Sequence, residues 1–193
     1  MDATLFVVIA AIVVTLVPLL WWIATYNRFV RLKHTVKESW SDIDVELKRR
    51  YELIPNLVAT VKGYAKHEAD VLERVVQLRN AAMQNHGSAQ SQAKDENALL
   101  LGLRSVFAVA ESYPQLKSDA NFRALQDELA VTEDRIAAAR RFFNGNVREL
   151  RDLREAFPSS LVASAMGLEM PSFFEHDDQN ERVVPRVDLG ARG

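Results

Sequence analysis

The sequence contains no cysteine, little glycine and almost no excess of charge. Without cysteine in its 193 residues, the chain can form no disulfide framework, thiolate nucleophile or cysteine-ligated zinc site. Seven glycines and an apolar fraction of 48% fit one ordered, helix-rich domain and exclude a disordered chain. A formal net charge of −2 excludes a strongly basic nucleic-acid-binding protein.

Catalytic motifs are missing as well. The chain has no glycine-rich phosphate loop and no Gly-x-Ser-x-Gly elbow. His67 and Glu68 resemble the start of a metalloprotease motif, but that motif needs a second histidine four residues after the first, where this chain has Val71. The sequence therefore predicts a protein that is not an enzyme and that holds no metal or other cofactor.

A long apolar run lies near the N-terminus. Residues 5–25 read "LFVVIAAIVVTLVPLLWWIAT" without a charge, and as a helix they would span roughly 32 Å, the thickness of a bilayer's hydrocarbon core. The alternative is a cleaved signal peptide, which is disfavoured by the missing basic region and by the length of the run. We expect one transmembrane helix, with Trp21, Trp22 and Tyr26 at the membrane interface.

Charges around this run predict its orientation. Arg28, Arg31, Lys33 and Lys37 follow it, whereas only Asp2 and the terminal amine precede it. Positively charged flanks remain in the cytoplasm. We therefore expect the N-terminus outside and the large C-terminal part in the cytoplasm.

Four later segments show the spacing of amphipathic helices. Apolar residues recur in steps of three and four over residues 36–54, 57–82, 99–113 and 122–153, and the polar run 85–96 predicts a loop. Four such helices with short connections indicate an antiparallel up-down-up-down four-helix bundle. The fold class is therefore predicted as all-α, a single transmembrane helix followed by this bundle.

A proline separates the first two stripes. Proline disfavours the helical conformation at the preceding residue, here Ile54, yet it suits the first turn of a new helix. Ile54 and Pro55 therefore predict a corner at which the second helix folds back on the first. The alternative is a kink within one continuous helix.

One carboxylate lies on an apolar stripe. A buried glutamate needs a partner, and heights measured from the corners at Pro55 and Pro114 place Glu68 level with Arg104, Thr132 and Arg135. These four residues are predicted to form a buried polar layer that fixes the register of the bundle. The alternative is a solvent-exposed Glu68.

The segment "FPSSLVASAMGLEMPSFF", residues 157–174, has almost no charge. If the fourth helix returns toward the bilayer, this segment emerges at the lipid surface, with Phe173 and Phe174 at the membrane interface. Packing across the open end of the bundle is the alternative. The expected organisation is an anchor over 1–26, a bundle over 27–157, a short apolar segment over 158–174 and a disordered tail over 175–193.

Residues 26–68, "YNRFVRLKHTVKESWSDIDVELKRRYELIPNLVATVKGYAKHE", closely resemble the LemA family. The segments "YPQLKSDANFRALQDELAVTEDRIAAARRFFN" and "FPSSLVASAMGLEMPSFFE" resemble later parts of that family in the same order. The resemblance implies a single-pass protein of the bacterial inner membrane with an antiparallel helical bundle, and no biochemical activity is firmly established for the family. The family usually has tyrosine where this chain has Phe143, so a role that needs that hydroxyl does not carry over.

The function expected from these features is that of a membrane-anchored, non-enzymatic scaffold or adaptor. Its partners would be the lipid bilayer and other membrane or cytoplasmic proteins, with a homo-oligomer as one form of assembly and no nucleic acid. The alternative is a membrane-shaping protein that contacts lipid and self-assembles on the membrane surface through the bundle and residues 157–174.

Overall fold

The computed structural model describes residues 3–175, which form six α-helices and contain no strand. The helices are α1 (Ala3–Tyr64), α2 (Ala69–Gln84), α3 (Ala89–Glu111), α4 (Pro114–Ser118), α5 (Ala120–Glu155) and α6 (Ser159–Ala165). The predicted all-helical class is confirmed. The predicted disordered tail lies outside the described residues from position 176 onward, so that part of the prediction stays untested.

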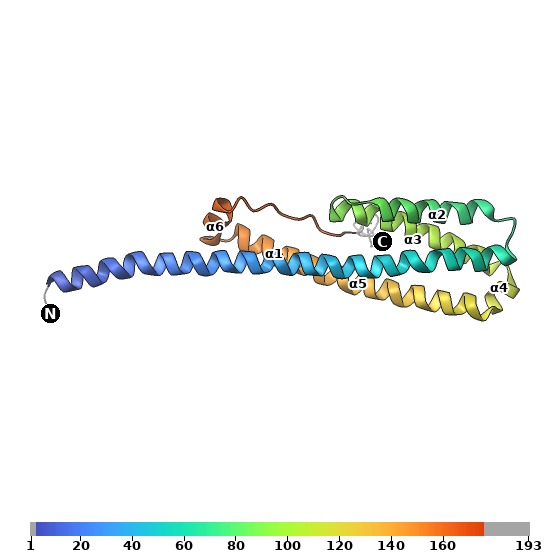
Figure 1. Ribbon diagram of the computed structural model, residues 1–193, viewed down its shortest axis with the longest axis horizontal. Helices are drawn as coiled ribbons and strands as arrows, with labels where there is room; N and C mark the ends of the chain where they lie inside the picture. Colours follow the sequence, from blue (N-terminus) through green and yellow to red (C-terminus); the bar gives the residue numbers. More distant parts are fainter. Residues whose placement is uncertain (1–2, 176–193) are drawn as a thin grey trace, which may run out of the picture.

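Helix α1 is a single rod of 62 residues that passes through both Pro18 and Pro55 (Figure 1). The predicted corner at Ile54 and Pro55 is therefore wrong, and the chain turns only after Tyr64. Ile54 is fully buried inside the helix, whereas Pro55 lies on the exposed side. Packing of the face that contains Ile54 outweighs the helix-breaking tendency of the proline.

Pro55 leaves one carbonyl group of α1 free for another helix. Proline has no N–H, so the carbonyl of Tyr51, four residues earlier, loses its usual intrahelical donor. Arg79 of α2 donates from Nε to the Tyr51 carbonyl oxygen at 2.6 Å. The carbonyl that lacks an intrahelical donor because of Pro55 is therefore a point of contact between α1 and α2.

The longer helices pack along the second part of α1. Helix α5 lies beside α1 over most of its own length, while α2 and α3 pair with each other and α2 also contacts α1 (Figure 1). Gly102 of α3 allows the close pairing, because a Cβ at this position would come within 2.8 Å of Leu78 Cδ1. The short α4 connects α3 to α5.

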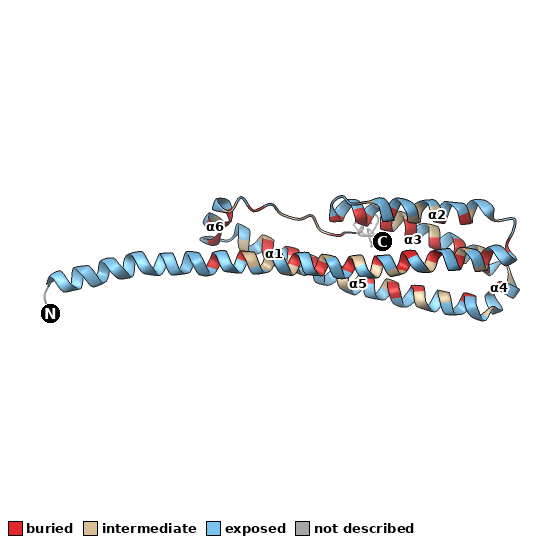
Figure 2. Ribbon diagram, in the orientation of Figure 1, coloured by how far each residue is buried: buried red, intermediate tan, exposed pale blue. Residues whose placement is uncertain are grey.

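Burial begins abruptly along α1. The first residues of the helix are all exposed, and the buried positions start at Thr25 and Phe29 (Figure 2). The core then follows the helix seams, and its fully buried side chains include Ile43, Leu57, Val61, Leu99, Val106, Val147 and Leu150. One helix therefore contains an exposed apolar segment and a packed segment.

The chain reverses again after α6. Gly167 follows the end of α6 with a φ of +57°, the left-handed conformation that glycine adopts readily after the end of a helix. Residues 166–175 then run without regular structure back along α1 and α5 (Figure 1). We call this stretch the C-terminal strap.

Candidate functional site

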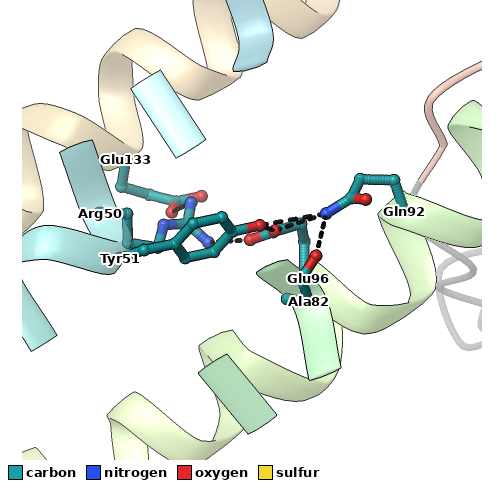
Figure 3. A network of polar contacts seen from close by, with 6 residues as sticks. All are labelled: Arg50, Tyr51, Ala82, Gln92, Glu96 and Glu133. Carbon is teal, nitrogen blue, oxygen red and sulfur yellow. Dashed lines mark hydrogen bonds and ion pairs between the residues drawn. The ribbon is translucent and has the colours of Figure 1, made fainter. Parts of the chain in front are cut away.

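A buried polar network joins α1, α3 and α5 (Figure 3). Its centre is Arg50 of α1, which is only 3% exposed. The guanidinium donates from Nη1 to Glu96 Oε2 of α3 at 3.0 Å, and Nη2 pairs with Glu133 of α5. The hydroxyl of Tyr51, the next residue on α1, donates to the other oxygen of Glu96.

Gln92 connects the network to α2. Its Nε2 lies 3.0 Å from Glu96 Oε1, 3.1 Å from the Tyr51 hydroxyl and 3.1 Å from the backbone oxygen of Ala82 (Figure 3). Together with the bond from Arg79 to the Tyr51 carbonyl, these contacts tie the pair α2 and α3 to α1. Residues from four helices thus meet at one level of the fold.

Burial and neighbouring charges both act on the pKa values of the network. Burial raises the pKa of Glu96, whereas the positive charge of Arg50 acts in the opposite direction. Burial and then the negative charge of Glu96 raise the pKa of Tyr51, so its phenol remains a protonated donor. Both oxygens of Glu96 accept hydrogen bonds, so this carboxylate joins α1 to α3.

The predicted polar layer is wrong in its membership. Glu68 lies half-buried at the N-terminus of α2, at the turn after α1, and Arg104 is exposed on α3. Thr132 is fully buried, but its hydroxyl donates to the Glu128 backbone oxygen of its own helix at 2.8 Å. Within residues 3–175, the ion pair of Arg135 is to Glu46, at 3.8 Å. The heights were measured from a corner at Pro55 that does not exist.

Sequence reasoning missed the residues that form the actual network. Arg50 follows Leu47 by three positions and precedes Ile54 by four, so its spacing alone marked it as a charged residue on the apolar face. Gln92 and Glu96 fell in the run predicted as a loop, whereas α3 begins at Ala89. Ser88 caps this helix by accepting a hydrogen bond from the Ser91 amide at 3.2 Å, a cap that serine at this position could have indicated.

A second cluster holds the C-terminal strap. The ring of Trp40 on α1 lies 5.4 Å from the Phe143 ring and 5.9 Å from the Phe174 ring, measured between centroids. The Asn144 side chain both donates to the backbone oxygen and accepts from the backbone N–H of Phe174, each at 2.9 Å. Phe174 is 2% exposed, so its predicted place at the membrane interface is wrong and it packs against the helices.

Phe173 is also engaged by the protein. The Arg151 guanidinium lies 4.4 Å from the centre of its ring, a cation–π contact, and the residue is half-buried. Its predicted contact with the membrane stays a prediction. The exposed apolar side chains of this region are Phe157, 82% exposed, and Leu161, 55% exposed.

The N-terminal segment of α1 meets the physical criteria for crossing a membrane. Its best 18-residue window has a mean hydropathy of 2.8 and none of it is buried, although such a helix near an N-terminus can also be a signal sequence. Trp21, Trp22 and Tyr26 are exposed at the end of this segment, next to the first buried residue, Thr25. Within residues 3–175, no three His, Asp or Glu side chains gather as a metal site would require.

Fold and site together define a class: an all-helical protein whose first helix begins as a long, exposed apolar segment and continues into a packed helical assembly. The chain belongs to the LemA family, since the sequence model of that family matches residues 39–189.

Similarity to curated relatives is low in identity but extends over most of each chain. Magnetosome protein MamQ 2 of Paramagnetospirillum magneticum is 24% identical over 204 residues, covering 91% of this chain and 75% of the relative. Magnetosome protein MamQ of Magnetospirillum gryphiswaldense is 23% identical, with 84% and 70% covered. Protein LemA of Metamycoplasma hominis is 21% identical, with 87% and 74% covered.

Proposed function

We propose that this protein is a membrane-anchored helical scaffold. The apolar segment of α1 crosses a bacterial inner membrane once, and the second part of α1 forms an antiparallel four-helix bundle with α2, α3 and α5. The bundle presents its surface to other membrane or cytoplasmic proteins. The observation that supports this most directly is the continuity of α1 from Ala3 to Tyr64, because an uninterrupted helix transmits the position of the anchor to the whole bundle.

Charge supports a cytoplasmic bundle. The basic residues Arg28, Arg31, Lys33 and Lys37 follow the apolar segment and would lie at the cytoplasmic face under the positive-inside rule. The absence of cysteine makes a direct test simple. In intact cells, a membrane-impermeant maleimide should label an A3C variant and should label an exposed A59C variant only after lysis. The reverse pattern would contradict this orientation.

A structural role fits the polar network. Its carboxylate Glu96 is held by Arg50, Tyr51 and Gln92, which suits fixing the register of helices rather than proton transfer. We therefore propose that the protein acts without catalysis and without a cofactor.

The scaffold proposal is tested by identifying the proteins that lie close to the bundle in cells. Proximity labelling from the C-terminal side of the full chain in cells should enrich a reproducible set of proteins. The matched control keeps residues 1–27 and replaces the remainder with an unrelated helical bundle, so that both proteins share the same anchor. Equal enrichment by the two proteins would refute a scaffold role for the bundle.

A second candidate function is contact with lipid and assembly on the membrane surface. The exposed side chains of Phe157 and Leu161 favour it, because α6 packs against α1 close to the end of the apolar segment (Figure 1). A double variant F157S/L161S should retain the anchor but lose any change of vesicle shape that the full chain produces. Unchanged vesicle shape with either protein would leave the scaffold as the better account.

A further inference from the structure

A cavity of about 690 Å³ lies between α1, α5 and the C-terminal strap. Its apolar lining includes Val36 and Trp40 of α1, Phe143 and Leu150 of α5, and Met170 of the strap. Binding sites for small molecules have this size and are lined mainly by apolar and aromatic side chains. The cavity therefore has the dimensions and the lining of a ligand site.

The strap that covers the cavity is fixed at its far end. The Asn144 side chain forms two hydrogen bonds with the Phe174 backbone, each at 2.9 Å. The Ser172 hydroxyl accepts a hydrogen bond from the Gln90 amide at 3.3 Å. The wall of the cavity is thus held by specific contacts to α3 and α5.

The rim of the cavity is polar and mainly basic. Lys33 and Lys37 of α1 lie along it with the carboxylate of Glu169 and the hydroxyls of Ser88 and Ser172. Two amines against one carboxylate favour an anionic group at this rim. A ligand that suits both the lining and the rim has an apolar tail and a negatively charged head.

A second cavity connects this site with the anchor. It has a volume of about 720 Å³, shares Lys33, Lys37 and Met166 with the first, and extends to Trp22 and Tyr26. These two aromatic residues mark the end of the apolar segment of α1. If that segment spans a bilayer, as proposed above, the second cavity opens where lipid headgroups lie.

We propose that the two cavities together form a groove that binds a single-chain anionic lipid from the bilayer. The acyl chain would lie against Trp40 and Phe143, and the headgroup would lie between Lys33 and Lys37. A fatty acid and an anionic lysophospholipid both belong to this class, because each has one acyl chain and an anionic head. The membrane as the source of the lipid rests on the proposed anchor, whereas the binding site itself rests on the two cavities.

The test uses Trp40 as a reporter. The chain has three tryptophans, so the full-length double variant W21F/W22F retains Trp40 alone. Incorporated in phosphatidylcholine vesicles, it should lose most of its fluorescence on titration with dibromostearate, because bromine quenches tryptophan only at short range. Trp40 lies roughly 22 Å beyond Thr25 along a helix that rises 1.5 Å per residue, so probe molecules that remain in the bilayer do not reach it.

Three controls make the result specific. Charge reversal in K33E/K37E should raise the half-saturating dibromostearate concentration at least tenfold. The matched reversal K62E/K66E, at the other end of α1 and in the turn that follows it, should leave that concentration unchanged. A reporter on the opposite, exposed face of α1, V45W in a W21F/W22F/W40F background, should not be quenched. Brominated lysophosphatidylglycerol separates a phosphate head from a carboxylate head, and either one quenching Trp40 supports the proposal.

Absence of saturable quenching at Trp40 would overturn the site, as would equal quenching of the V45W reporter. Quenching by vesicles of brominated two-chain phosphatidylcholine to the same degree would overturn the choice of a single-chain anionic lipid. Flotation of the same vesicles measures anchoring separately. Flotation without quenching rejects the groove alone, and quenching without flotation retains the site but rejects the bilayer as its source.

Discussion

Among the charged residues of the packed helices, Arg50 should be the one whose loss destabilises the protein most. The substitution R50M removes the guanidinium but keeps an unbranched apolar side chain in place of the aliphatic part of arginine. Glu96, whose side chain is 4% exposed, would then remain buried without its cation. Breaking a buried ion pair in this way costs about 3 to 5 kcal/mol, a large part of the stability of a typical domain.

The neighbouring arginine provides the control. Arg49 pairs with Glu128 at 2.5 Å, but both side chains are about two-fifths exposed, at 40% and 43%. R49M is the same chemical change one residue away on the same helix, and solvent screening makes its effect far smaller. Both variants would be compared with the parent by urea unfolding of the full chain in detergent micelles, followed by circular dichroism.

The same unfolding experiment, repeated at several pH values, gives a second test of the network. Burial raises the pKa of Glu96 and Arg50 opposes that rise, so R50M should raise the pKa further. A carboxyl group whose pKa is higher in the folded than in the unfolded protein binds extra protons when folded, and stability falls as pH rises through that interval. The deficit of R50M should therefore be larger at neutral pH than at mildly acidic pH. Equal stability of R50M and R49M, or a deficit that grows on acidification, would refute this account of the network.

Three further predictions follow from other contacts. R79M should lower the free energy of unfolding of the parent by about 1.5 to 3 kcal/mol, the range for hydrogen bonds to charged groups. The loss should be much smaller in a P55A background, where position 55 again donates to the Tyr51 carbonyl. Additive losses in a double-mutant cycle would contradict this account of Pro55. F174A should release the strap and increase proteolysis between residues 166 and 175, and N144A should do so more weakly; unchanged cleavage would show that these contacts do not hold it. Asp119 caps α5 by accepting a hydrogen bond from the Phe122 amide at 2.9 Å, and this bond lowers the pKa of Asp119. The stability that the ionised carboxylate adds is therefore present above its pKa in the unfolded chain and is lost as pH falls through its pKa in the folded protein. The melting temperature of D119A should be reduced at neutral pH and match that of the parent at about pH 2.

Apolar spacing was sufficient to predict which faces of the helices are buried. The stripe over residues 122–153 predicted most of the buried positions of α5, including Phe122, Leu129, Ile136, Phe143 and Leu150, but it missed Val147. Such a prediction succeeds because burial of apolar surface dominates the packing of helices. The rule makes no statement about polar residues that are buried together.

The errors at Pro55 and in the polar run 85–96 have a common cause, because both depend on contacts between residues that are far apart in the sequence. The helix-breaking tendency of Pro55 is local, whereas the contacts that keep α1 continuous, among them the bond from Arg79 to the Tyr51 carbonyl, come from distant parts of the sequence. Gln92 and Glu96 fell in the predicted loop because polar residues are usually exposed and the run has no apolar spacing. They are buried because Arg50 and Tyr51, more than forty positions earlier, satisfy them.

The two halves of the packed assembly are held to α1 in different ways. Helix α5 lies along α1, where the rings of Trp40 and Phe143 pack together, and ion pairs from Arg28 to Glu149 and from Arg50 to Glu133 join the same two helices. The hydrogen bonds and ion pair that join α2 and α3 to α1 run from Arg79, Gln92 and Glu96 to residues 50 and 51. An apolar seam is insensitive to charge, whereas a buried ionic contact depends on the protonation and exact partners of each group. Arg50 takes part in both attachments, through Glu133 of α5 and Glu96 of α3, so the network at Arg50 couples the position of the pair α2 and α3 to that of α5.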